Sequence, residues 1–185
     1  MRALSQADHD RLKVAIAQAE ERTRLHIATV VVPASDRYVA YPLAYGALFA
    51  LALGGVLALF WPHFSIRLAF VLETFGFALV SLVLDWMPIR LLLVPRSVQR
   101  ARAHTLAHRE FAARILTTHK GGLLLFVSLG ERYVELMADR DLHIRVGQKV
   151  WDDIVSGVTT SAGSKPLADC LLAAINAAAA AAELR

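Results

Sequence analysis

The chain has 185 residues, of which 56% are hydrophobic and 19% are charged, and its mean hydropathy is +0.47. A charged fraction below the usual quarter predicts that part of the chain is not exposed to water. The formal charge of +4 does not favour nucleic-acid binding, because the basic residues lie beside apolar segments and do not alternate with aromatic residues. The single cysteine, Cys170, excludes an internal disulfide. The polar start, MRALSQADHD, gives no indication of a cleavable signal peptide.

The first predicted elements are a helix and a strand. Residues 5–22 have the pattern of an amphipathic helix, and Ser5 and Asp8 have the spacing of a capping box. The segment LHIATVVVP at 25–33 predicts a strand, because it is rich in β-branched residues and stops at Pro33. A single strand would expose both of its edges, so we expect it to pair with strands from later in the chain.

Residues 41–88 predict a transmembrane helical hairpin. Its spans, about 42–61 and 66–86, are each roughly twenty residues long, which at about 1.5 Å per residue is enough to cross the hydrocarbon core. Two buried core helices are the alternative interpretation. Because the flanking arginines lie before the first span and after the second, the positive-inside rule predicts that both termini are cytoplasmic in a bacterial inner membrane. These arginines are Arg37, Arg90, Arg96, Arg100 and Arg102.

Small residues recur every four positions along the first span, at Gly46, Ala50, Gly54 and Ala58. Such a stripe lets another helix approach closely, and Gly76 is expected on the partner face of the second span. The same span contains Glu73, although a carboxylate at this depth costs about 3 kcal/mol on insertion scales. We expect Glu73 to take part in helix pairing or in contacts between copies, with a transport role as the alternative.

After the hairpin, residues 97–118 predict a basic helix. Its expected inner face carries Val98, Ala101, Thr105, His108, Ala112 and Ile115. The juxtamembrane residues Arg96, Arg100 and Arg102 are candidates for binding anionic lipid headgroups. His104 and His108 have the four-residue spacing that can hold a zinc ion, but no adjacent third ligand is evident. A histidine packed in the core is the alternative for His108.

Two strands follow, GGLLLFVSL and RYVELMA, and the turn between them predicts a β-hairpin. Asp139 and Asp141 come directly after the second strand. Together with Asp152 they could supply oxygen ligands to a divalent cation such as calcium, whereas a solvated strand end is the simpler interpretation. An aspartyl nucleophile is disfavoured, because it requires further strands and the remaining residues predict only two helices, around 150–158 and over 167–183.

Neither half of the chain has enough strands to cover its own apolar faces. We therefore predict one α+β cytoplasmic domain, formed by residues 1–40 and 96–185, with a small mixed sheet flanked by helices. The transmembrane hairpin of residues 41–88 interrupts this domain.

The segments DRLKVAIAQAEERTRLHIATVVVPASDRY and GGLLLFVSLGERYVELMADRDLHIRVGQKVWDDIVSGV resemble the TPM-domain family, in particular its short bacterial branch with transmembrane helices inside the domain. The matching features are the LFVSLGER strand and turn, the Val-Glu strand and the helix that contains Trp151. The resemblance implies an α+β sandwich. The best-known members are thylakoid-lumen and photosystem-repair proteins. Acid phosphatase activity is attributed to a plant member, assembly or repair roles to others, and divalent-metal sites to acidic loops in some.

The loop after the second hairpin strand departs from the family pattern. Many relatives carry Gly-x-Gly-Leu-Glu there, whereas this chain has Asp139-Arg140-Asp141-Leu142-His143. We therefore expect a membrane-anchored interaction module without catalytic activity or a cofactor, which assists the assembly or quality control of membrane complexes. Its partner would be another protein or a second copy of the chain. The alternative function is a metal-assisted, acid phosphatase-like hydrolase centred on Asp139 and Asp141.

Overall fold

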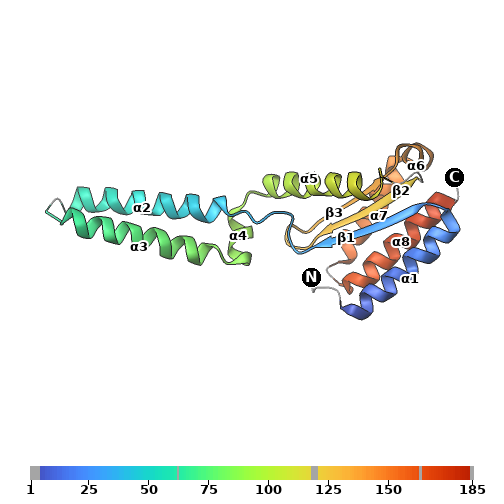
Figure 1. Cartoon of the computed structure of the whole chain (residues 1–185), viewed down its shortest axis with the longest axis horizontal. Coiled ribbons are helices and arrows are strands. Elements are labelled where there is room, and N and C mark those ends of the chain that lie inside the picture. Colours follow the sequence, from blue (N-terminus) through green and yellow to red (C-terminus); the bar gives the residue numbers. More distant parts are fainter. Residues whose placement is uncertain (1–4, 62, 118–120, 163, 184–185) are drawn as a thin grey trace. The chain divides into compact units, whose positions relative to one another are not determined.

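The computed structural model describes residues 5–61, 63–117, 121–162 and 164–183 (Figure 1). Within these residues the chain is of the α+β class, with eight helices and a sheet of three strands. It divides into two compact units. The first, here called the split domain, comprises Met1–Ser35 and Arg100–Arg185, and the second, here called the hairpin unit, comprises Asp36–Gln99.

The sheet joins strands from both ends of the split domain. Its strands are β1 (His26–Val32), β2 (Gly122–Ser128) and β3 (Tyr133–Ala138), in the order β1-β2-β3. β1 is parallel to β2, with Ile27 opposite Leu123, and β2 is antiparallel to β3, with Phe126 opposite Glu135. The early strand therefore pairs with the later β-hairpin, as its unsatisfied edges predict. Because β1 and β2 are parallel, a long crossover must connect them, and the hairpin unit lies within it.

Four helices cover the first face of the sheet. They are α1 (Gln6–Thr23), α6 (Arg140–Val146), α7 (Gln148–Ser161) and α8 (Leu167–Glu183), and α1 and α8 lie side by side (Figure 1). The core on this face includes Leu125 and Val127 of β2, with Trp151 of α7 and Leu171 of α8. Every residue of β2 is buried, as expected for the central strand of a sheet covered on both faces.

The second face is covered by α5 (Arg96–Arg114), whose buried side differs from the sequence prediction. Ala103 and Ala107 are fully buried and pack against a cluster that includes Leu124 and Phe126. Four residues that were predicted to face inward are exposed instead: Ala101, Thr105, His108 and Ala112. The prediction was wrong at these four positions because the fully buried positions are alanines, which let the helix lie close to the sheet but give little hydrophobic contrast, with Leu106 and Phe111 packed beside them. The core interpretation of His108 is therefore excluded.

Two short helices were not predicted, α4 (Met87–Leu93) and α6. Each has seven residues, which is too few turns for an apolar period to be recognised. The segment after β3 was expected to be a solvated strand end followed by only two helices. It begins a third helix instead, because Asp139 occupies the N-cap position of α6.

The hairpin unit contains α2 (Ala40–Phe60) and α3 (Ile66–Leu84), which pack along each other. Both helices are long and apolar enough to cross a membrane. Their large apolar side chains mostly point outward, as Leu59 and Ile66 illustrate with exposed fractions of 79% and 83%. An exposed apolar surface of this extent is costly in water and favourable in lipid.

Candidate functional site

The three aspartates expected to bind a cation lie on two helices. Asp139 caps α6, and its Oδ1 accepts a hydrogen bond of 2.7 Å from the backbone N–H of Arg140. Asp141 is exposed in the first turn of α6, and Asp152 on α7 accepts a hydrogen bond of 2.7 Å from the Gln148 amide. The carboxylate of Asp139 therefore has a local structural role. Cation binding at this loop stays a prediction.

A different set of side chains converges between α5 and β3. One potential ligand atom from each of His104, His108 and Glu135 lies within 4.8 Å of the others. Among the described residues, no other group of three histidine, cysteine or carboxylate side chains is this close. His104 Nδ1 is 2.9 Å from Glu135 Oε1 and 3.2 Å from Oε2. The two imidazole rings meet edge to face, with their centroids 4.2 Å apart.

The local fold explains why these side chains meet. His104 and His108 are one helical turn apart, so they lie on the same side of α5. Side chains alternate between the two faces of a strand, so Glu135 shares the α5 face of β3 with Tyr133 and Met137, which pack against the cluster on that face. Glu135 is therefore a carboxylate in an otherwise apolar strand, and its side chain is only 19% exposed.

Tyr133 supports this carboxylate. Its hydroxyl donates a hydrogen bond of 3.0 Å to Glu135 Oε2. Burial raises the pKa of Tyr133 well above its usual value, and the negative charge of Glu135 and the hydrogen bond to it raise the pKa further. The phenol therefore stays protonated at neutral pH and holds one carboxylate oxygen, which leaves Oε1 directed towards His104.

Glu135 is the functional candidate that the sequence analysis missed. The histidine pair was recognised from its spacing, but the third residue lies 31 positions after His104. One pattern indicated it: in the strand YVELM, Glu135 interrupts the side that also carries Tyr133 and Met137. The sequence did not show that α5 would cover that side of the sheet.

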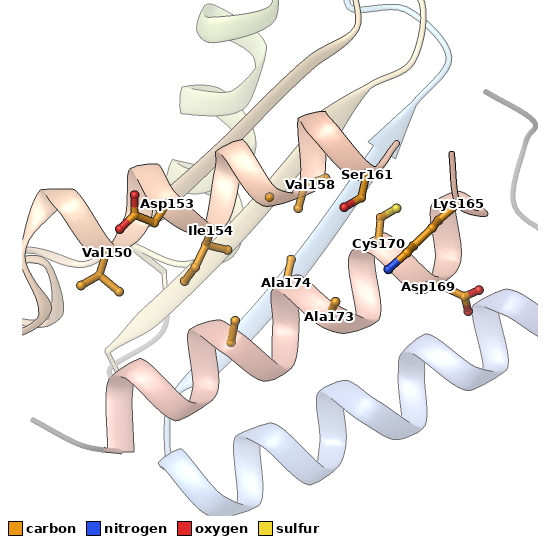
Figure 2. Close-up of a pocket in the computed structure, with 12 residues that line it drawn as sticks. Val150, Asp153, Ile154, Val158, Ser161, Lys165, Asp169, Cys170, Ala173 and Ala174 are labelled. Atoms are coloured by element: carbon orange, nitrogen blue, oxygen red, sulfur yellow. The ribbon is translucent and has the colours of Figure 1, made fainter. Parts of the chain in front are cut away.

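A groove of about 480 Å³ lies between α7 and α8 (Figure 2). Its apolar walls include Val150, Ile154 and Val158 from α7 and Ala174 from α8. Asp153 lies towards one end, and Ser161, Lys165 and Asp169 lie towards the other (Figure 2). Because Gly157 and the alanines of α8 carry little or no side chain, the groove has room for apolar side chains from outside.

Residues of the LFVSLGER segment form hydrogen bonds that hold the strands together at one end of the sheet. The buried hydroxyl of Ser128 hydrogen-bonds to the carboxylate of Glu131, which also accepts a hydrogen bond of 2.8 Å from the backbone N–H of Ser35. The backbone N–H of Leu129 donates to the carbonyl of Val32 at 3.0 Å. These contacts join the β2–β3 turn to the end of β1. Ser128 and Glu131 of the motif therefore have a structural role.

In the hairpin unit, glycines set how closely α2 and α3 approach. A Cβ atom at Gly46 would overlap Ser81 Oγ and lie 3.2 Å from the carbonyl oxygen of Phe77. A Cβ atom at Gly54 would overlap Glu73 Oε1, and one at Gly76 would lie 3.0 Å from Phe49 Cε1. Glu73 therefore packs against α2 at Gly54, a position that accommodates a carboxylate because it has no side chain.

The small-residue stripe does not extend along the whole interface. Ala50 is half-buried, but Ala58 is exposed, while Leu53 and Leu57 are half-buried. Four residues correspond to about 400° of helical rotation, so a four-residue stripe drifts by about 40° per step. By Ala58 it has turned about 120° away from Gly46, which explains why Ala58 lies outside the α2–α3 contact.

The base of the hairpin unit is held by Arg90. Its guanidinium donates a hydrogen bond of 2.6 Å to the carbonyl of Arg37 and forms an ion pair of 2.6 Å with Asp85. The chain entering α2 is thereby connected to the chain leaving α3. The candidate lipid-binding residues Arg96, Arg100 and Arg102 are all exposed on α5.

No protein-family model matches the chain, and no curated protein gives a match to it. Membership of the TPM-domain family is therefore still an inference from the quoted sequence segments.

Proposed function

We propose that the chain is a membrane-anchored interaction module of the TPM type. It binds an apolar segment of a partner protein in the groove between α7 and α8, and thereby assists the assembly or quality control of membrane complexes. The groove is the observation that carries this proposal. No catalytic activity is included in it.

The anchoring part of the proposal is supported by α2 and α3. Their length and outward apolar side chains suit a bilayer, in which each backbone amide is bonded within its own helix. Arg37, Arg90 and the arginines at the start of α5 follow the positive-inside pattern, so we infer a bacterial inner membrane with both termini cytoplasmic. Arg96, Arg100 and Arg102 would then lie near anionic headgroups.

The partner-binding part is supported by the chemistry of the groove. The apolar groove between α7 and α8 suits an amphipathic helix of the partner, which would place its apolar side chains over Gly157 and Ala174. Asp153 lies towards one end of the groove and Lys165 towards the other, where the carboxylate of Asp169 is paired with Arg11 at 3.4 Å. The two ends therefore differ in charge and favour one orientation of a segment that carries complementary charges.

The proposal is tested by photocrosslinking in native membranes. A photoreactive residue replaces Ala173, which is exposed and lines the groove, or Ala17, which is exposed on α1. We expect one defined adduct from position 173 and none from position 17. Mass spectrometry of the adduct identifies the partner and the segment that was bound.

A substitution that fills the groove separates specific binding from random capture. Gly157→Leu introduces a side chain where no atom lies within 4 Å, so the fold can accept it, and we expect the adduct to fall at least about tenfold. Ser156→Leu changes the neighbouring exposed residue outside the groove and is the matched control. An adduct unaffected by Gly157→Leu contradicts the proposal. An adduct between two copies of the chain would mean that the groove binds a second copy of the chain and not a different protein.

A further inference from the structure

We propose that His104, His108 and Glu135 form a binding site for a divalent transition-metal ion, with Zn²⁺ as the best-fitting ion. The site lies between α5 and β3 of the split domain and is separate from the acidic loop at Asp139 and from the groove used in the proposed function. Binding of a partner in the groove does not require this ion, because the two sites share no residues.

The donor set points to the class of metal. Two neutral imidazoles and one carboxylate suit Zn²⁺, which accepts this combination and completes a tetrahedron with water. Calcium and magnesium prefer sets made of oxygen atoms and are poorly matched by two imidazoles. The site therefore selects a different ion from the calcium considered for Asp139 and Asp141.

The distances are close to those that a bound ion needs. With zinc–ligand bonds of about 2.0–2.1 Å, the ligand atoms of a tetrahedral site lie roughly 3.3 Å apart. The three ligand atoms here are already within 4.8 Å of one another. The remaining adjustment falls on the histidines: the side chain of His104 is 52% exposed, and His108 is also exposed, so both can rotate without disturbing the core.

Glu135 is the prearranged member of the set. It is held on the rigid sheet, and Tyr133 donates a hydrogen bond to its Oε2. Hydrogen bonds to a ligating carboxylate orient it and raise metal affinity, so Tyr133 is a positioning residue. Bound metal would connect the helix on the second face of the sheet to β3, an edge strand.

Another pair in the same domain provides a matched comparison. His26 Nδ1 lies 2.8 Å from Glu20 Oε1, which is the same kind of histidine–glutamate contact as that between His104 and Glu135. The contact at His26 is not part of a three-residue group, because no second histidine joins it among the described residues. If a histidine–glutamate pair alone bound Zn²⁺, both pairs would bind it. A site that needs a third ligand can form only at His104 and Glu135, where His108 supplies it.

The test uses the full-length chain in detergent micelles, freed of affinity tag and of metal by chelation. ZnCl₂ is titrated by calorimetry, Co²⁺ is added to detect the absorption bands of tetrahedral coordination, and CaCl₂ is the comparison. We expect one Zn²⁺ per chain, tetrahedral Co²⁺ bands that Ca²⁺ does not displace, and a higher unfolding temperature with Zn²⁺.

Variants then locate the ion. His108→Gln removes an exposed ligand and should weaken Zn²⁺ binding by about 100-fold or more, while Tyr133→Phe should weaken it by about tenfold. His26→Gln should leave the affinity unchanged. His104→Gln provides a second ligand variant if His108→Gln does not fold. The proposal is wrong if the wild-type chain binds no Zn²⁺, if His108→Gln binds as tightly as the wild type, or if His26→Gln weakens binding equally.

Discussion

The split domain and the hairpin unit use the same kinds of apolar residue in opposite ways. In the split domain Leu124 and Phe126 are completely buried on the face of the sheet that α5 covers. In the hairpin unit Phe70 is 70% exposed, and Gly46, Gly54 and Gly76 lie where the two helices touch. A soluble fold buries its large side chains and leaves small ones where space permits. A lipid-facing pair of helices turns its large side chains outward and packs through small ones.

The largest difference should come from truncating a buried phenylalanine of the split domain and an exposed phenylalanine of the hairpin unit. Phe126→Ala creates a cavity in the centre of the sheet and should lower the free energy of unfolding of the split domain by about 3–5 kcal/mol. Phe70→Ala removes a side chain that meets no core and should leave that stability nearly unchanged. Denaturant titration in micelles measures both variants by the fluorescence of buried Trp151, in a chain in which Trp61 and Trp86 are replaced by Phe. Equal losses would contradict the division into two units.

A smaller effect should come from the helix contact in the hairpin unit. Gly46→Leu forces a side chain into Ser81 and towards the Phe77 carbonyl, and overpacking of this kind costs about 1–3 kcal/mol. Gly55→Leu is the control, because no atom lies within 4 Å of a Cβ placed there. SDS titration of α2–α3 association, followed by energy transfer between labels on the two helices, should separate the variants. Similar behaviour would show that the glycine contact does not determine the pairing.

The smallest effect concerns the start of α1. Hydrogen bonds from the side chain and backbone of Ser5 lower the pKa of Asp8 below its ordinary value of 3.8. The stabilisation is therefore present above pH 3.8 and is lost as the pH falls through the lowered pKa. Asp8→Asn should reduce the unfolding temperature slightly at pH 7, by less than the effects above, and the difference from wild type should vanish in strong acid. A difference that persists there would rule out the charge as its cause.

The sequence predicted most accurately those features that depend on one segment at a time. The capping box of Ser5 and Asp8, the limits of β1 and the approximate limits of both hairpin helices follow from local pattern and composition. The pairing of β1 with the later β-hairpin was also predicted, because a lone strand leaves backbone groups unpaired, but the sequence did not indicate that β2 is the neighbour.

Features that depend on how segments pack together were not predicted. The inner face of α5 was misplaced because Ala103 and Ala107 contact the sheet, with Leu106 and Phe111 packed beside them, and not the residues of the predicted stripe around His108. That error placed His108 in the core and concealed its proximity to Glu135. Which face of the sheet α5 covers is decided by tertiary packing, and residue spacing within one segment does not predict it.

Membrane topology is the most direct test of the central claim that lipid-embedded helices interrupt a single cytoplasmic domain. With Cys170 replaced by Ala, single cysteines are introduced as Ala17→Cys, His63→Cys and Asn176→Cys, and each is treated with a membrane-impermeant maleimide in spheroplasts and in everted vesicles. We predict that position 63 reacts in spheroplasts, whereas positions 17 and 176 react only in everted vesicles. Reaction of positions 17 and 176 from opposite sides would contradict the account, as would reaction of all three from one side.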